Sequence, residues 1–143
     1  MATLKFSHAW SIVVAALAKA RELDLDPVAV VVLDAGGHTF MAVHEDDTGI
    51  LRIDIANAKA WGALGLGRGG ARIAESAAKN PAFFSSLAAI SGGRIATSRG
   101  GVLIRGGGGE IVGAVGISGA HAEQDEACAV HGIETSGLVP DAG

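Results

Sequence analysis

The sequence predicts an α+β fold in which a five-stranded antiparallel sheet is flanked by helices on both faces. Two observations support this class. Glycine-rich turns join neighbouring apolar runs, and short hairpins of this kind require antiparallel pairing. Segments with helical periodicity stand before, between and after these runs, which is typical of layered α+β domains. We therefore expect one domain over residues 1–143, with a core at about 4–135 and a loose tail at 137–143.

The first part of the chain predicts a helix followed by a hairpin. Phe6–Leu23 has apolar residues at helical spacing, and Ser7 is the expected N-cap. The predicted apolar stripe consists of Trp10, Val13, Val14 and Leu17. Val28–Leu33 is a continuous β-branched run, typical of a strand buried on both faces. Asp34–Gly37 supplies the turn to a second strand at His38–Val43.

The rest of the chain predicts three further helical segments and three short strands. Arg52–Leu64 and Ala71–Lys79 have helical patterns, whereas Pro81–Ile90 is ambiguous and most resembles a helical turn. The predicted strands are Arg94–Thr97, Val102–Arg105 and Glu110–Ile117. A final helix is expected at about His121–Glu134.

Charge and composition argue against several classes of protein. Eleven basic and fifteen acidic residues give a net charge of −4, without the basic stripe of a nucleic-acid binder. The longest apolar runs, Ile12–Ala18 and Val28–Leu33, fall short of the ~20 residues that span a bilayer. The single Cys128 and the absence of a signal-peptide pattern favour a cytoplasmic protein. We assign no metal site.

Three stretches in order carry a resemblance to a known family. They are Val30–His38, Ile53–Ala60 and Gly109–Ala129. Together they resemble the GlcG/HbpS-like family of small haem-binding proteins, whose module also forms the C-terminal domain of PduO-type cobalamin adenosyltransferases. The resemblance covers almost the whole chain, from about Leu4 to Ile133. It implies a profilin-like fold of α/β/α layers, a homo-oligomer, and haem or another tetrapyrrole as a candidate ligand.

The chain departs from this family after the second predicted strand. Relatives often have Arg-Met-Asp there, whereas this chain has His44-Glu45-Asp46. A permanent cation is thereby replaced by a group that titrates near neutrality and is followed by a carboxylate. This departure favours specialised acid–base chemistry.

Two classes of function follow, and the sequence leaves both open. The first is a binding module for a small ligand such as haem, with His8 on the first helix as the candidate axial donor. Gly113, Gly116 and Gly119 would leave room for a ligand or a neighbouring subunit. The absence of Tyr and the scarcity of other aromatic residues make a stacked haem pocket less favourable.

The second class is a cofactor-independent catabolic enzyme acting by proton transfer on a small organic acid or ring compound, as an isomerase, hydratase or lyase. His44 would be the base, with Asp46 on the same side of the strand and Glu45 on the opposite side. Lys59 and Arg105 are the cations expected to hold a carboxylate substrate or a haem propionate.

Overall fold

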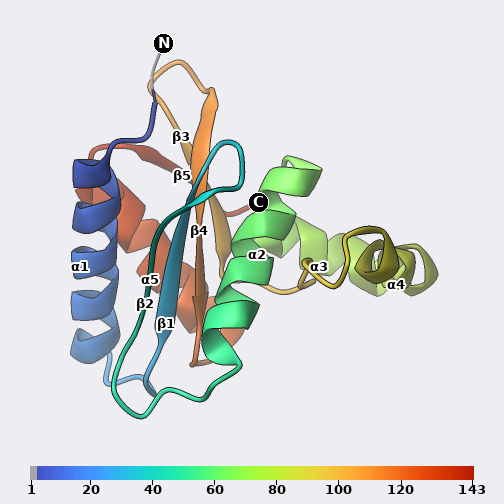
Figure 1. The fold of residues 1–143 in the computed structure, drawn as a ribbon, viewed down its shortest axis with the longest axis horizontal. Helices are drawn as coiled ribbons and strands as arrows, with labels where there is room; N and C mark the ends of the chain where they lie inside the picture. Colours follow the sequence, from blue (N-terminus) through green and yellow to red (C-terminus); the bar gives the residue numbers. More distant parts are fainter. Residues whose placement is uncertain (1–2) are drawn as a thin grey trace.

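The computed structural model describes residues 3–143, and it contains a five-stranded antiparallel sheet with helices on both faces (Figure 1). The strands are β1 (Ala29–Asp34), β2 (Thr39–His44), β3 (Gly101–Arg105), β4 (Ile111–Ser118) and β5 (Val139–Asp141). The helices are α1 (Phe6–Glu22), α2 (Arg52–Leu66), α3 (Gly70–Lys79), α4 (Pro81–Ile90) and α5 (Ala122–Thr135). The strand order is β2-β1-β4-β3-β5. The predicted fold class is confirmed.

The alternation of side chains along β1 divides the core into two layers. Val30 and Val32 pack with α1 and α5, whereas Val31 and Leu33 pack with α2. Figure 1 shows α1 and α5 on one side of the sheet and α2 on the other, with α3 and α4 extending away from the sheet. Within residues 3–143, no helix combines the length and apolar character needed to cross a membrane.

A bulge in the β1–β2 hairpin adds one residue to β2. Val32 pairs with Met41, but the next residue, Leu33, pairs with Thr39, so Phe40 has no partner on β1. As a result, Phe40 and Met41 both contact the core on the α1 side, although they are consecutive in the strand. The bulge therefore turns Phe40 toward that layer.

The predictions for two segments were wrong. One predicted strand is not a strand, and a segment expected to be a loose tail forms a strand of the sheet. Arg94–Thr97 forms no strand, because the segment is a connection in which the Arg94 guanidinium lies 4.0 Å from the ring centroid of Trp61. The expected loose tail contains β5, which pairs with β3 at the edge of the sheet. An ion pair of 2.9 Å between Arg105 Nε and Asp141 Oδ2 joins these two strands.

Helix α1 differs from its prediction in its N-cap and in its buried face. The N-cap is Lys5 rather than Ser7. The side chains of Trp10 and Val14 are 58% and 51% exposed, so the predicted stripe is not the buried face. The buried residues are Ala9, Ile12, Val13, Ala15, Ala16 and Ala20. Alanine predominates on the buried face because α1 packs closely against α5. A Cβ at Gly132 of α5 would lie only 2.7 Å from the carbonyl oxygen of Ile12.

The glycines of β3 and β4 let the backbone of α2 lie directly against the sheet. A Cβ at Gly116 would overlap the carbonyl group of Ala56, and one at Gly101 would overlap that of Lys59. Likewise, Cβ atoms at Gly113 and Gly119 would overlap backbone oxygens of Leu33 and Pro27. The space expected for a ligand or subunit at Gly113, Gly116 and Gly119 is therefore filled by the chain itself.

This close approach predicts that Gly116→Ala is destabilising. The new methyl group would push α2 away from β4, and overpacking of this kind costs about 1–3 kcal/mol. Urea unfolding followed by circular dichroism measures the loss in the free energy of unfolding. Gly107→Ala is the matched control, because a Cβ at Gly107 meets open space. Equal stability of the two variants would contradict the role assigned to Gly116.

Candidate functional site

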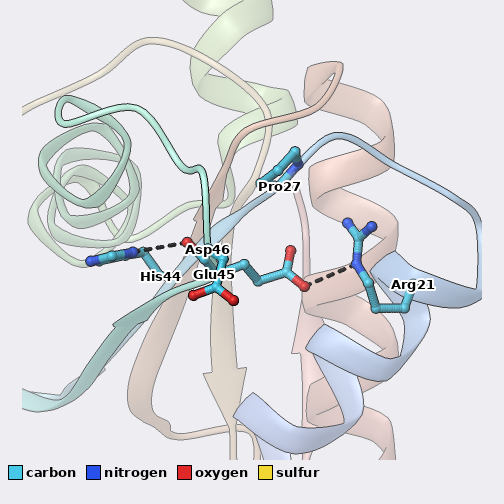
Figure 2. A pocket seen from close by; sticks show the side chains of 5 residues that line it. All are labelled: Arg21, Pro27, His44, Glu45 and Asp46. Atoms are coloured by element: carbon cyan, nitrogen blue, oxygen red, sulfur yellow. Dashed lines mark hydrogen bonds and ion pairs between the residues drawn. The ribbon is translucent and has the colours of Figure 1, made fainter.

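His44 is the last residue of β2, and its position in the sheet decides which way it faces. It pairs with Ala29, whose side chain belongs to the layer covered by α2, so the imidazole is directed toward that layer. Figure 2 shows the ring turned away from Glu45 and Arg21. The side chains of His44 and Glu45 thus point to opposite faces of the sheet, as the alternation of side chains along a strand predicts.

Glu45 holds the end of β2 to α1 and to the start of β1. Its Oε2 lies 2.9 Å from Arg21 Nε, and its Oε1 accepts a hydrogen bond of 2.9 Å from the backbone N–H of Val28. Glu45 and Arg21, together with Pro27, His44 and Asp46, line a cavity of about 420 Å³ (Figure 2). Both carboxylate oxygens of Glu45 are therefore engaged in fastening the strand end.

A hydrogen bond to the backbone orients the His44 ring. Nδ1 lies 2.9 Å from the carbonyl oxygen of Glu45. Because a carbonyl only accepts, Nδ1 carries the proton in the neutral ring and Nε2 keeps its lone pair. The strand ends at His44, so strict alternation does not extend to Asp46, which lies in the following turn. The ring nitrogen is thus held by a main-chain oxygen.

An apolar surface adjoins His44 where the loop enters α2. A cavity of about 310 Å³ is lined by His44, Thr48, Gly49, Ile50 and Ile53. A second cavity of about 340 Å³ shares Gly49 and Ile50 with the first and continues over Leu51, Arg52 and Ile55. Ile50 is 96% exposed. His44 therefore lines one part of this apolar surface and Arg52 another, a feature that the sequence interpretation missed. The signal in the sequence that could have indicated this surface is the pair of apolar residues Ile50 and Leu51 directly before Arg52, the first residue of α2.

Lys59 lies in the interior, on the far side of α2 from solvent. Its side chain is 5% exposed, and its Nζ donates to the carbonyl oxygen of Ile117 at 2.9 Å and to Asp125 Oδ2 at 3.3 Å. Asp125 Oδ1 accepts the backbone N–H of Ala120 at 3.0 Å. The pair joins α2 to α5, which cover opposite faces of the sheet.

Burial has the largest effect on both members of this pair. Desolvation lowers the pKa of Lys59, and the negative charge of Asp125 opposes that shift. Desolvation raises the pKa of Asp125, and the positive charge of Lys59 together with the N–H groups of Ala120 and Gly119 opposes it. Each group therefore depends on the other to remain charged.

Arg105 and His8 are distant in topology from His44. Arg105 lies on β3, with β1 and β4 between it and β2, and its guanidinium donates to Asp141 and to the carbonyl oxygen of Gly109. His8 lies in the first turn of α1, where its Nδ1 accepts the backbone N–H of Lys5 at 3.1 Å. Of the predicted site residues, the structure brings together only His44, Glu45 and Asp46 around one cavity.

The fold defines a class of small α+β proteins in which one antiparallel sheet lies between layers of helices. Residues 4–134 match the family described as haem-degrading protein HbpS-like. The chain belongs to this family.

Comparison with individual proteins agrees with this membership. An uncharacterised 15.0 kDa protein of Citrobacter freundii is 31% identical over 131 residues, covering 87% of this chain and 86% of that protein. The crystal structure of a PduOC–haem complex is similar, with 26% identity, a TM-score of 0.86 and coverage of 96% and 97%. The Klebsiella pneumoniae protein ORFY has 27% identity, a TM-score of 0.86 and coverage of 96% and 92%.

The buried pair predicts that Lys59→Met is strongly destabilising at neutral pH. The substitution leaves the Asp125 carboxylate buried without a cation, which costs about 3–5 kcal/mol. The pKa of Asp125 then rises further, and stability linked to a raised pKa is lost as pH increases through it. The deficit relative to the unmodified protein should therefore shrink as pH falls through the raised pKa of Asp125.

Urea unfolding at several pH values measures this difference. Lys79→Met is the matched control, because its ion pair with Glu75 is exposed and contributes about 1 kcal/mol or less. A deficit of Lys59→Met that does not depend on pH would contradict the assignment.

Proposed function

We propose that the protein binds haem or a related tetrapyrrole on the surface formed by His44 and the first turn of α2. Membership of the HbpS-like family supports a small-ligand function of this kind. The haem complex of PduOC, which shares 26% identity and nearly the whole fold, supports haem in particular. The remaining support comes from the chemistry of the residues around His44.

His44 fits the role of axial ligand. Bound haem supplies an iron that accepts an imidazole lone pair and a flat macrocycle that needs apolar contacts. The hydrogen bond from Nδ1 to the Glu45 carbonyl leaves Nε2 free to ligate, and ligating histidines in proteins are held by hydrogen bonds of this kind. Ile50 and Ile53 would contact the macrocycle beside the imidazole.

Arg52 fits the role of a propionate partner. It lines the far part of the same apolar surface, and one of its nitrogens donates to Ser118 Oγ at 3.3 Å. Its other N–H groups could donate to a carboxylate, for which guanidinium geometry is well suited. The observation that carries the proposal is that one apolar surface, which includes the exposed Ile50, is lined both by His44 with a free ring nitrogen and by Arg52.

His8 was the ligand expected from the sequence, and His44 is the better donor in physical terms. Because His8 Nδ1 accepts a backbone N–H, its neutral ring carries the proton on Nε2. Ligation through Nε2 would require that hydrogen bond to be given up. His44 needs no such rearrangement.

Acid–base catalysis on a small organic acid or ring compound is the second candidate function. In the cavity of about 420 Å³ that His44 shares with Arg21, His44 would be the base and Arg21 the anion-binding cation, but the imidazole would first have to turn toward Arg21. Neither Lys59 nor Arg105 lines this cavity, and Arg21 is already paired with Glu45. The haem proposal is preferred because, within residues 3–143, neither His44 nor Arg52 forms an ion pair with a carboxylate.

We also propose that the protein assembles as a homo-oligomer through α4. This helix has no charged side chain, and Phe83 and Ile90 are 51% and 75% exposed. Among the helices and strands of residues 3–143, α4 contacts only α3. A helix that is apolar on all sides is normally buried. We therefore propose that α4 is buried against a second copy of the chain.

Titration with hemin tests the haem proposal. We expect a shifted Soret band that saturates at one haem per chain. His44→Ala should weaken binding by at least about tenfold, equivalent to about 1.4 kcal/mol. His8→Ala should bind like the unmodified protein. His38→Ala is the matched control, since His38 is also an exposed histidine with its Nδ1 held by an oxygen.

The same series contains the outcomes that would overturn the proposal. A response that never saturates would show that hemin binds without a specific site. Unchanged affinity in His44→Ala would remove His44 as the ligand, and loss of binding in His8→Ala would transfer that role to His8. Normal hemin binding by His44→Ala, with loss of a proton-transfer activity, would favour the enzymatic function.

Light scattering after size-exclusion chromatography tests the assembly proposal. Ile90→Glu places a charge on the apolar face of α4, so we expect its molar mass to fall toward that of one chain. Leu23→Glu is the control, because Leu23 is exposed at the end of α1. A molar mass equal to one chain in the unmodified protein would contradict the proposal.

A further inference from the structure

A second cavity lies at the end of the sheet opposite His44. Its volume is about 490 Å³, and it lies between the N-terminal segment, the β1–β2 turn and the β3–β4 hairpin. The register of the sheet gives its position, because Ala29 pairs with His44 at one end of β1 and Asp34 pairs with Gly113 at the other. The two sites are therefore separated by the length of β1.

The wall of this cavity is mostly apolar. Four large apolar side chains line it, those of Leu4, Phe40, Ile111 and Val112. Leu4 belongs to the core on the α1 side, and Phe40 packs against that core. Phe40 reaches this wall because the bulge in β2 directs it there. Concave apolar sites with a few polar groups are typical of small-molecule binding.

The charged groups that line the cavity are the carboxylates of Asp34 and Glu110. Among residues 3–143, Glu110 has no side-chain hydrogen bond and no ion pair to a cation. Asp34 uses Oδ1 to accept the backbone N–H groups of Gly36 and His38, both at 2.9 Å, and the same oxygen lies 3.2 Å from His38 Nδ1, which leaves Oδ2 free within residues 3–143. Burial alone would raise the pKa of Asp34, but these hydrogen bonds and the nearby His38 ring outweigh it and lower the pKa.

The nearest cation on the β3–β4 hairpin does not neutralise these carboxylates. Arg105 donates to Asp141 Oδ2 at 2.9 Å and to the carbonyl oxygen of Gly109 at 2.8 Å. The lining of the cavity therefore combines apolar walls with negative charge. Such a lining is complementary to a ligand with an apolar body and a positive head group.

We propose that this cavity binds small primary amines with an aromatic or aliphatic body. The ammonium group lies between Asp34 and Glu110 and donates charge-assisted hydrogen bonds to their free oxygens. The body packs against Phe40 and the apolar side chains around it. This site is independent of the haem surface, because no residue lines both.

Amide chemical shifts recorded during titration with 2-phenylethylamine test the proposal. We expect saturable shifts for residues of the β1–β2 turn and the β3–β4 hairpin. Two probes of similar size, 2-phenylethanol, which is neutral, and phenylacetate, which is negative, should bind at least about tenfold more weakly. Shifts confined to the loop after His44 would instead assign the amine to another site and overturn the proposal.

Two variants and a control make the experiment specific to this cavity. Glu110→Gln keeps the shape of the side chain and should weaken amine binding at least about fivefold. Ala35→Trp adds a large group to an exposed wall residue and should abolish the shifts. Glu123→Gln removes an exposed carboxylate elsewhere and should have no effect.

Four further results would overturn the proposal. They are equal binding of the neutral probe, unchanged binding in Glu110→Gln, unchanged shifts in Ala35→Trp, and no shifts up to about 10 mM amine. Shifts of the same residues on concentrating the protein without amine would assign the cavity to a second copy of the chain. Hemin titration should be identical in Glu110→Gln and the unmodified protein, which keeps this test separate from the haem proposal.

Discussion

The direct contact between the backbone of α2 and the sheet is the constraint on which the rest of the structure depends. It requires a position without a side chain on each of two neighbouring strands, at Gly101 and Gly116. With α2 seated this closely, Lys59 reaches past the end of β4 to Asp125 on the opposite layer. The same seating sets the first turn of α2, with Arg52 and Ile53, beside the end of β2. One backbone contact thus connects the interior ion pair with the exposed site.

Local patterns were sufficient for much of the fold. The β-branched run before Asp34, the glycine turn and the helical spacing after Arg52 each depend on neighbouring residues, and the structure has elements close to the predicted ones. The errors concern features that only tertiary contacts decide. Val139–Asp141 becomes a strand because β3 offers it an unpaired edge, and Arg94–Thr97 remains a connection although its pattern resembles a strand.

The candidate site likewise combines features that the local sequence predicts with features that only tertiary contacts decide. His44, Glu45 and Asp46 are adjacent in the chain, so their proximity follows from the sequence alone. The partners that give them different tasks come from far away, with Arg21 on α1 for Glu45 and Ile53 on α2 for His44. Lys59 was expected near a ligand because its ammonium group could hold a carboxylate or a propionate. Its burial arises from a pairing with Asp125, 66 residues further along the chain, which no local pattern contains.

The bulge at Phe40 has a consequence for how this hairpin can evolve. Side chains of a strand change face with every residue, so a single insertion or deletion within 41–44 would exchange the directions of His44 and Glu45. The imidazole would then point at α1, and the carboxylate that fastens the strand would point at α2. The length of this strand can therefore change only by pairs of residues or by the gain or loss of a bulge.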